Sequence, residues 1–214
     1  MPHRKLDKFV ASFPTKDFTA GEVILHQGDD VVNVYIIQTG IVKAYDINKE
    51  GEQKTVIYDT PGEAIPVSYI YTKADHALYY YEAYTDCKLA LVPLVDFQKF
   101  MLSEPKVAFH FLTIMAERYL DFARRVNGLE QLKAEDKIIY SLDFLSRRFG
   151  DRRNPERVTV DIPLSQQEFA DFVGLTRETV SGTMGKLRRK GVIQYGNGKG
   201  LMLNIKKISD LIEP

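Results

Sequence analysis

Three residues near the C-terminal end of the chain have side chains that can recognise the edges of nucleotide bases. Arg177 can donate two hydrogen bonds to guanine, Glu178 can accept one from cytosine, and Ser181 can do either. Their spacing places all three within about one turn at the start of a predicted helix. Side chains at this end meet base edges when a helix lies in the major groove of DNA. The three residues therefore predict direct readout of a DNA sequence.

The same segment carries an excess of positive charge. Between residues 177 and 200 there are six basic side chains and a single acidic one. A solvated helix face usually mixes both signs of charge, so the bias favours DNA binding over a structural helical hairpin. Contacts to phosphate position a protein on DNA without reading its sequence. We expect them from Thr176, Lys186, Arg188, Arg189 and Lys199.

The segment from residue 164 to 190 predicts two short helices joined by a tight turn. Ser165 and Glu168 have the spacing of a capping box, which begins the first helix. Gly174 stands where a helix needs a left-handed residue at its end. Thr176 can cap the second helix. Apolar residues at helical spacing give each helix a buried face: Phe169, Phe172 and Val173, then Val180, Met184 and Leu187. The second helix is expected to turn outward Glu178, Ser181, Gly182, Gly185 and Arg189.

Composition and charge indicate a globular protein with two different halves. Of the 214 residues, 44% are hydrophobic and 27% charged, which is an ordinary globular balance. No apolar run approaches the ~20 residues of a membrane span, and the N-terminus lacks a signal-peptide core. We therefore expect a cytoplasmic protein outside the membrane. Residues 1–104 hold ten basic and fifteen acidic side chains, whereas residues 105–214 hold nineteen and fourteen. This asymmetry indicates a sensor followed by a nucleic-acid-binding module.

Residues 19–102 predict a succession of short strands. Runs rich in Val, Ile and Tyr are separated by glycines and by a turn at residues 48–52. Many short strands at regular spacing indicate a β-barrel, jelly roll or β-roll. A metal-dependent enzyme on such a barrel is the competing interpretation, but it needs clustered histidines and carboxylates. His26 and His76 have no histidine near them in the sequence, so we expect no metal site and no catalytic residue.

Tyrosines are concentrated between residues 69 and 81. Strand propensity alone accounts for tyrosine in such a segment, and this interpretation is favoured. The functional alternative is an aromatic-lined pocket for a small apolar or aromatic effector. Its candidate lining residues are Val67, Tyr69, Tyr79, Tyr81 and Phe122.

A long helix is predicted from Pro105 to about residue 132, because proline is favoured in the first turn of a helix. Its apolar residues alternate at spacings of three and four, which is the pattern of a coiled-coil seam. Phe109, Phe111 and Ile114 provide a second apolar face. Such a helix can cover its own domain and a partner at once. We expect a homodimer whose interface includes Leu112, Met115, Tyr119, Phe122 and Val126.

The C-terminal part completes a winged arrangement. A hinge is expected at residues 132–136, a helix at about 135–149 and a short strand at 158–160. Two further strands, at 192–195 and 201–205, flank a glycine-rich turn that carries Lys199 at its tip. This lysine can reach phosphate.

These motifs resemble one family over nearly the whole chain. The segment LSQQEFADFVGLTRETVSGTMGKLRRKGVI is similar to the helix-turn-helix of the Crp/Fnr superfamily of bacterial transcription regulators, which includes the cyclic AMP receptor protein. The earlier segment FTAGEVILHQGDDVVNVYIIQTGIVKAYDINKEGEQKTVIYDTPGEAI resembles the cyclic-nucleotide-binding β-roll of the same family. This match is carried by Gly21, Gly28–Asp29, Tyr35–Ile36, Gly40 and Pro61–Gly62. In the family the long helix forms the dimer interface and closes the effector site.

The chain departs from the family at the effector site. Members that bind cyclic nucleotides hold the ribose with a Gly-Glu pair and the phosphate with an Arg-Ser pair. The corresponding positions here are Pro66–Val67 and Ala77–Leu78, and residues 66–84 contain no arginine. Lys73 is the only nearby cation, and we expect it in an exposed loop. Burying a phosphate without a cation is costly, so we expect an effector other than cyclic AMP.

Two metal cofactors of the family are also not expected. The single cysteine, Cys87, excludes an Fnr-type iron–sulfur cluster. A lone His76 in a loop and a lone Cys87 in a strand are poor candidates for haem ligands. In the recognition helix, many members carry an arginine where this chain has Gly182, so the family's operator sequence does not carry over.

The sequence therefore predicts an α+β fold: an N-terminal cyclic-nucleotide-binding-like β-roll, a long dimerisation helix and a C-terminal winged helix-turn-helix. The expected domains are residues 1–104, 105–132 and 133–214. The resemblance implies a transcription regulator, not an enzyme, that binds palindromic double-stranded DNA as a homodimer, contacts RNA polymerase and responds to an unidentified small-molecule effector. A constitutive DNA-binding regulator with a vestigial sensor pocket is the alternative that stays open.

Overall fold

The structure is a computed structural model that describes residues 2–66, 69–70, 72, 76–151, 154, 156–196 and 200–212. It divides into two compact units, residues 1–114 and 115–214.

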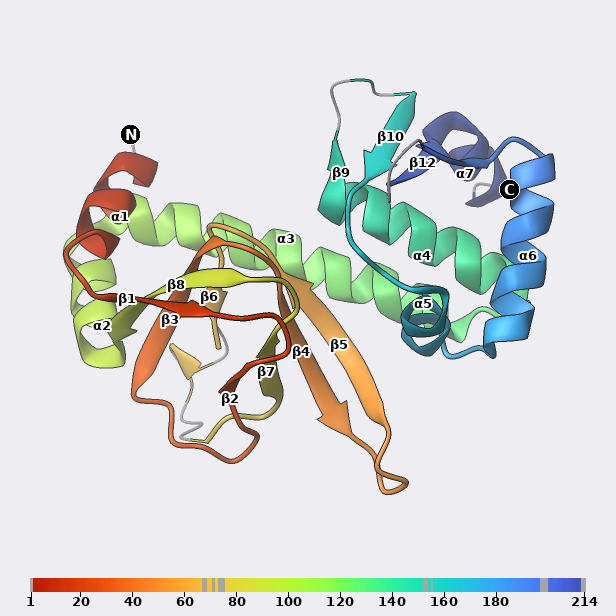
Figure 1. The fold of residues 1–214 in the computed structure, drawn as a ribbon. Helices are drawn as coiled ribbons and strands as arrows, with labels where there is room; N and C mark the ends of the chain where they lie inside the picture. Colours follow the sequence, from red (N-terminus) through yellow and green to blue (C-terminus); the bar gives the residue numbers. More distant parts are fainter. Residues whose placement is uncertain are drawn as a thin grey trace. The chain divides into compact units, whose positions relative to one another are not determined.

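The helices (Figure 1) are α1 (Pro2–Val10), α2 (Leu94–Ser103), α3 (Pro105–Glu130), α4 (Ala134–Phe149), α5 (Gln166–Val173), α6 (Arg177–Arg189) and α7 (Ile205–Ile212). The strands of the first unit are β1 (Thr15–Phe18), β2 (Val23–Leu25), β3 (Asn33–Thr39), β4 (Val42–Ile47), β5 (Gln53–Asp59), β6 (Ala64–Ile65), β7 (Tyr80–Ala83) and β8 (Cys87–Pro93). Those of the second unit are β9 (Gly150–Asp151), β10 (Arg157–Val160), β11 (Ile193–Tyr195) and β12 (Leu201–Asn204).

The first unit is a β-roll of two antiparallel sheets, as predicted. One sheet has the strand order β1-β8-β3-β6 and the other β2-β7-β4-β5. Alternate residues along paired strands point into the core, because side chains in a strand alternate between its two faces. On β4 and β7 the alternating buried residues are Val42, Ala44, Tyr81 and Ala83, and Tyr45 is buried as well, where the pairing of β4 with β5 shifts register. The runs rich in Val, Ile and Tyr between turn residues were therefore sufficient to predict these strands.

The predicted turn between β4 and β5 is present. The backbone N–H of Asn48 donates to the carbonyl of Glu52 at 3.0 Å, and the Asn48 side chain accepts from the Glu52 N–H at 2.8 Å. Gly51 has φ of 79°, a left-handed value that glycine adopts without steric cost.

The prediction of strands up to residue 102 was wrong at its C-terminal end. Residues 94–103 form the helix α2, which follows Pro93 directly. Phe97 and Met101 lie four positions apart and are both buried, which is the helical period. The helices α1 and α7 and the short strands β1 and β6 were also not predicted.

The second unit holds the winged helix-turn-helix that the sequence predicts. The strands form a sheet of order β11-β12-β10-β9, and α4, α5 and α6 form the helical part (Figure 1). The strand expected to reach Ile205 ends at Asn204, because Asn204 begins α7 by accepting the N–H of Lys207 at 3.1 Å through its side chain. The division of the chain into three domains stays a prediction. The boundary between the two compact units falls inside α3.

No helix among the described residues combines the length and apolar character that crossing a lipid bilayer requires.

Candidate nucleic-acid interface

The helix-turn-helix begins with the predicted capping box. The Ser165 hydroxyl accepts the backbone N–H of Glu168 at 3.2 Å, and the Glu168 carboxylate accepts the backbone N–H of Ser165 at 2.8 Å. Two amides that α5 leaves without an internal partner are thereby satisfied. The direction in which the chain enters α5 is fixed by these bonds.

The turn between the two helices is fixed by Gly174. Its φ of 68° and ψ of 40° are left-handed, and a residue with a Cβ atom is disfavoured there by roughly 1–2 kcal/mol. The N–H of Leu175 donates to the Ala170 carbonyl at 3.0 Å. The Thr176 hydroxyl then accepts the N–H of Thr179 at 3.3 Å and begins α6. Caps of this kind typically contribute about 1 kcal/mol.

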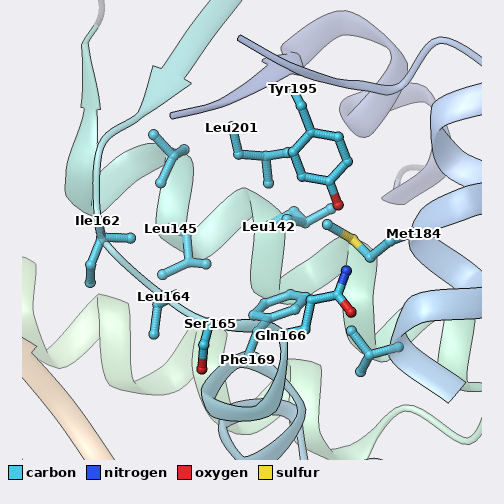
Figure 2. Close-up of a pocket in the computed structure, with 12 residues that line it drawn as sticks. Leu142, Leu145, Ile162, Leu164, Ser165, Gln166, Phe169, Met184, Tyr195 and Leu201 are labelled. Carbon is cyan, nitrogen blue, oxygen red and sulfur yellow. The ribbon is translucent and has the colours of Figure 1, made fainter. Parts of the chain in front are cut away.

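An apolar core supports α6 from behind. The residues predicted to face inward on α5 and α6 are all buried. Thr183 is buried as well. The burial of this polar side chain was not predicted. Figure 2 shows side chains of α4, α5, α6 and the wing converging on a common pocket. Its volume is about 90 Å³. Its lining includes Leu142, Leu145, Leu164, Phe169, Met184 and Tyr195. The cavity belongs to this core and not to the exposed face of α6.

The outward face of α6 carries the three predicted base-reading residues. Arg177, Glu178 and Ser181 are all exposed, as expected for side chains that approach DNA. Gly182 is exposed too, and a Cβ atom added there would have nothing within 4 Å. A Cβ atom added at Gly185 would lie 3.8 Å from the Arg189 guanidinium, an ordinary contact. Packing within the chain therefore requires neither glycine.

The basic side chains of this segment do not share one environment. Lys186, Arg188 and Arg189 are all exposed. Arg188 lines a separate pocket with Arg157 and with residues of β11 and β12, so it lies next to the wing sheet. Lys199 lies outside the described residues. The predicted phosphate contacts stay predictions for all of these positions and for Thr176.

Lys190 has a structural partner. Its ammonium group lies 2.6 Å from the Glu135 carboxylate of α4. The Lys190 carbonyl accepts a hydrogen bond from the side chain of Lys207 at 2.7 Å. These contacts connect the C-terminal end of α6 to α4 and α7. A positive charge in this segment is therefore not by itself evidence of a DNA contact.

The predicted dimer residues divide into two groups. Leu112, Tyr119 and Val126 recur every seven residues and are exposed, with Tyr119 at 73%, whereas Met115 and Phe122 are half-buried. The second apolar face was partly wrong. Phe111 is buried as expected, but Phe109 is 72% exposed and lies on the side of Leu112. The exposed apolar stripe of α3 consists of Phe109, Leu112, Ala116, Tyr119, Leu120 and Val126.

The predicted effector pocket stays untested. Tyr69 and Tyr81 are buried and Tyr79 is half-buried, which suits both a pocket lining and ordinary strand packing. Val67 lies outside the described residues, and Phe122 belongs to the other compact unit. The ring of Tyr80, which was not assigned to the pocket, stacks on Tyr45 with centroids 5.2 Å apart.

The cysteine is held within the β-roll. Burial raises the pKa of the Cys87 thiol, and its Sγ lies 3.0 Å from the Thr85 carbonyl and 3.2 Å from that of Ile41. Such a thiol stays protonated near neutral pH and is a poor nucleophile. Within the described part of the chain, no three His, Cys, Asp or Glu side chains are grouped in a way that could hold a metal ion.

Comparison with known families matches both units. Residues 15–104 match the model described as "Cyclic nucleotide-binding domain". Residues 138–213 match the model described as "Crp-like helix-turn-helix domain". The two matches lie in the order in which the β-roll and the helix-turn-helix occur along the chain.

The relatives in sequence are named as regulators. The Global nitrogen regulator of Synechococcus elongatus is 28% identical over 179 residues, which are 83% of this chain and 80% of the relative. The Nitrogen fixation regulation protein FixK of Bradyrhizobium diazoefficiens is 26% identical over 196 residues, 91% and 80% of the two chains. The solved structure of FixK2 from Bradyrhizobium japonicum has the same fold, with a TM-score of 0.78, 20% identity and coverage of 94% and 98%. With the β-roll, the winged helix-turn-helix and both family models in agreement, the chain belongs to the Crp/Fnr family of DNA-binding transcription regulators.

Proposed function

We propose that the protein is a homodimeric regulator that reads a palindromic operator with α6 and changes its affinity for DNA when an effector other than cyclic AMP binds. The observation that carries the proposal is the outward face of α6. Arg177, Glu178 and Ser181 stand exposed at its N-terminal end, and the Thr176 cap fixes where that end begins. This is the end of a recognition helix that meets base edges.

The exposed stripe of α3 supports the dimer. Three of its members recur every seven residues, which is the repeat of a two-stranded coiled coil. Large apolar side chains exposed in a contiguous row indicate an interface with another chain. A two-fold dimer would present two copies of α6 to half-sites about one turn of DNA apart, and the operator should therefore be palindromic.

The residues at the family's effector positions support a ligand other than cyclic AMP. Ala77 is buried and Pro66 is buried, and neither side chain can donate a hydrogen bond or neutralise a phosphate. Leu78 is exposed. On the basis of the family match, we also propose that the protein contacts RNA polymerase and is located in the cytoplasm. A protein that binds DNA equally well with and without ligands would instead be a constitutive regulator.

The experiment begins with selection of a binding site from random DNA by the full-length protein. Fluorescence anisotropy then measures the affinity of the wild type, Glu178→Ala and Lys186→Ala for the selected site and for its single-base variants. Glu178→Ala should weaken binding to the selected site by ~1–3 kcal/mol and relax the preference at one base pair. Lys186→Ala is the matched control and should weaken binding to all sequences alike, with a smaller salt slope.

Two results would count against the proposal. Selection that yields no enriched sequence would contradict operator binding. If Glu178→Ala weakens binding to every variant equally, Glu178 does not read a base and the proposed orientation of α6 is wrong.

A further inference from the structure

The first unit contains a cavity of about 540 Å³ that no part of the proposed function uses. It lies between α1, β3, the turn at residues 61–63 and the N-terminal half of α3. Its volume is within the range of small-molecule sites, which are commonly ~300–1,000 Å³. We propose that this cavity is a binding site for a small molecule with an apolar body and one cationic group.

The walls of the cavity are mostly aliphatic. Leu6 and Val10 come from α1, Ile36 and Ile37 from β3, and Ile114 from α3. Val10 and both residues of β3 are buried. Sites for small ligands are typically lined in this way, with a few polar groups that fix the orientation of the ligand. The aliphatic walls therefore predict the apolar body of the ligand.

The wall formed by α1 is fixed from its other side. The rings of Phe9 and Phe100 stack with centroids 3.9 Å apart and an interplanar angle of 2°. The Lys5 ammonium lies 2.7 Å from the Glu104 carboxylate. Both contacts hold α1 against the segment around α2, so the wall does not depend on a ligand for its position. A preformed site of this kind loses less conformational entropy on binding.

The polar groups of the cavity predict the charge of the ligand. Asp7 is exposed on α1, and Glu63 is buried at the turn. The Glu63 carboxylate accepts the N–H of Thr60 at 2.7 Å and its hydroxyl at 3.1 Å, which fixes its position. Gln38 and His110 also line the cavity. Among the described residues that form the lining there is no lysine or arginine that would attract an anionic ligand. An ammonium group would be attracted to Asp7 at the rim.

The position of the cavity on α3 links it to the proposed dimer. His110 and Ile114 each lie two residues from Leu112, which places them roughly 160° away from it around the helix. A ligand would thus contact α3 on the side opposite the exposed stripe and leave the stripe free for a partner. The role of this ligand as effector rests on the proposed function, whereas its binding in the cavity does not. Binding itself is measured without DNA, so failure of the site and failure of DNA recognition are distinguishable.

The test uses three probes that share one indole body and differ in charge. Tryptamine carries an ammonium group, tryptophol is neutral and indole-3-propionate is an anion. Calorimetric titration of the full-length protein measures their affinities, and the methyl NMR signals of isoleucine locate them. Tryptamine should bind most tightly and indole-3-propionate least tightly, with the largest shifts at Ile36, Ile37 and Ile114. No binding of tryptamine, or equal binding of the anion, would overturn the proposal.

Two variants and one control locate the interaction. Asp7→Asn should weaken tryptamine binding about threefold and leave tryptophol unchanged, because an exposed charge contributes modestly. Asp17→Asn removes the same charge from β1, outside the lining, and should change neither. Ala11→Trp places a large ring at the exposed rim and should abolish binding of all three probes while DNA binding and thermal unfolding confirm that the protein is folded. Unchanged tryptamine binding to a folded Ala11→Trp protein would show that the probe binds elsewhere.

Discussion

The guanidinium carbon of Arg125 lies 3.7 Å from the centroid of the Phe172 ring. Arg125 belongs to the C-terminal half of α3, and Phe172 belongs to α5, the first helix of the helix-turn-helix. Asp121, one turn earlier on α3, lies 3.8 Å from Arg148 of α4. The C-terminal half of the proposed dimer helix is therefore attached to the helices that position α6.

The contact between Arg125 and Phe172 should matter for both stability and DNA affinity. Arg125→Leu keeps much of the side-chain bulk and removes the cation, and it should lower the free energy of unfolding by ~1–2 kcal/mol. Denaturant titration measures this change, and anisotropy measures DNA affinity. Arg124→Leu is the control, because Arg124 pairs with Asp121 within α3 and its side chain is 41% exposed. Equal effects of the two variants would show that the contact between Arg125 and the Phe172 ring makes no contribution of its own to stability or DNA affinity.

The exposed stripe of α3 predicts a dimer that charge can dissociate. Leu112→Glu combined with Tyr119→Glu would bury like charges across the two-fold axis, and the protein should become monomeric. Sedimentation velocity measures the change. Thr113→Glu adds a charge on an exposed position beside the stripe and should leave a dimer. Met115 and Phe122 are less suitable for this test because they are half-buried in the single chain, and their substitution would also affect folding.

Gly182 should show opposite effects on folding and on DNA binding. Alanine is favoured over glycine inside a helix by up to ~1 kcal/mol, and the added methyl group would touch nothing within the chain. Gly182→Ala should therefore raise the melting temperature of the free protein. Its affinity for the selected operator should fall if the backbone of α6 approaches the floor of the groove there. An unchanged affinity would mean that the glycine has no part in recognition.

Cyclic AMP should not bind at physiological concentration. Pro66, Ala77 and Leu78 occupy positions where related proteins hold the ribose and phosphate, and they offer no charge to the nucleotide. Calorimetry with the purified protein should give no binding heat, and a thermal-shift assay should show no stabilisation. A micromolar dissociation constant would contradict the prediction and would require a cation from elsewhere in the chain.

The Cys87 thiol should react slowly in the folded protein. Because burial raises its pKa, less of it is thiolate at a given pH in the folded state than in the unfolded state. Alkylation by iodoacetamide at pH 8 should be slower by about tenfold or more in the native protein than in denaturant. Mass spectrometry follows the reaction. Equal rates would show that the thiol is exposed by local opening.

The elements that could be predicted from sequence are those with local signals. The capping box at Ser165, the left-handed Gly174 and the glycine turn at residues 48–52 each depend on residues within one turn of each other. The helix α2 was missed because Leu94, Phe97 and Met101 follow a strand without an intervening glycine. The same residue types serve both structures, and only their spacing distinguishes them.

The cavity beside α1 could not have been predicted from sequence. Its walls come from residues as far apart as Leu6 and Ile114, and each of them is an ordinary aliphatic residue in its own segment. The role of Lys190 was hidden for a similar reason. Its partner Glu135 lies on another helix, so the lysine was indistinguishable from its basic neighbours until the fold was known.

The position of α3 limits how such proteins can be recombined. The helix runs unbroken from Pro105 to Glu130, and the boundary between the two compact units falls within it, after Ile114. A chimera joined at that boundary would have to continue the helical hydrogen-bond ladder from one half of α3 into the other. A chimera joined at residues 131–133 would bring a foreign helix against Arg148 and Phe172. Exchange of sensors between relatives therefore has to keep the C-terminal half of α3 with the helix-turn-helix. The foreign N-terminal half of the helix must join it in the same helical phase.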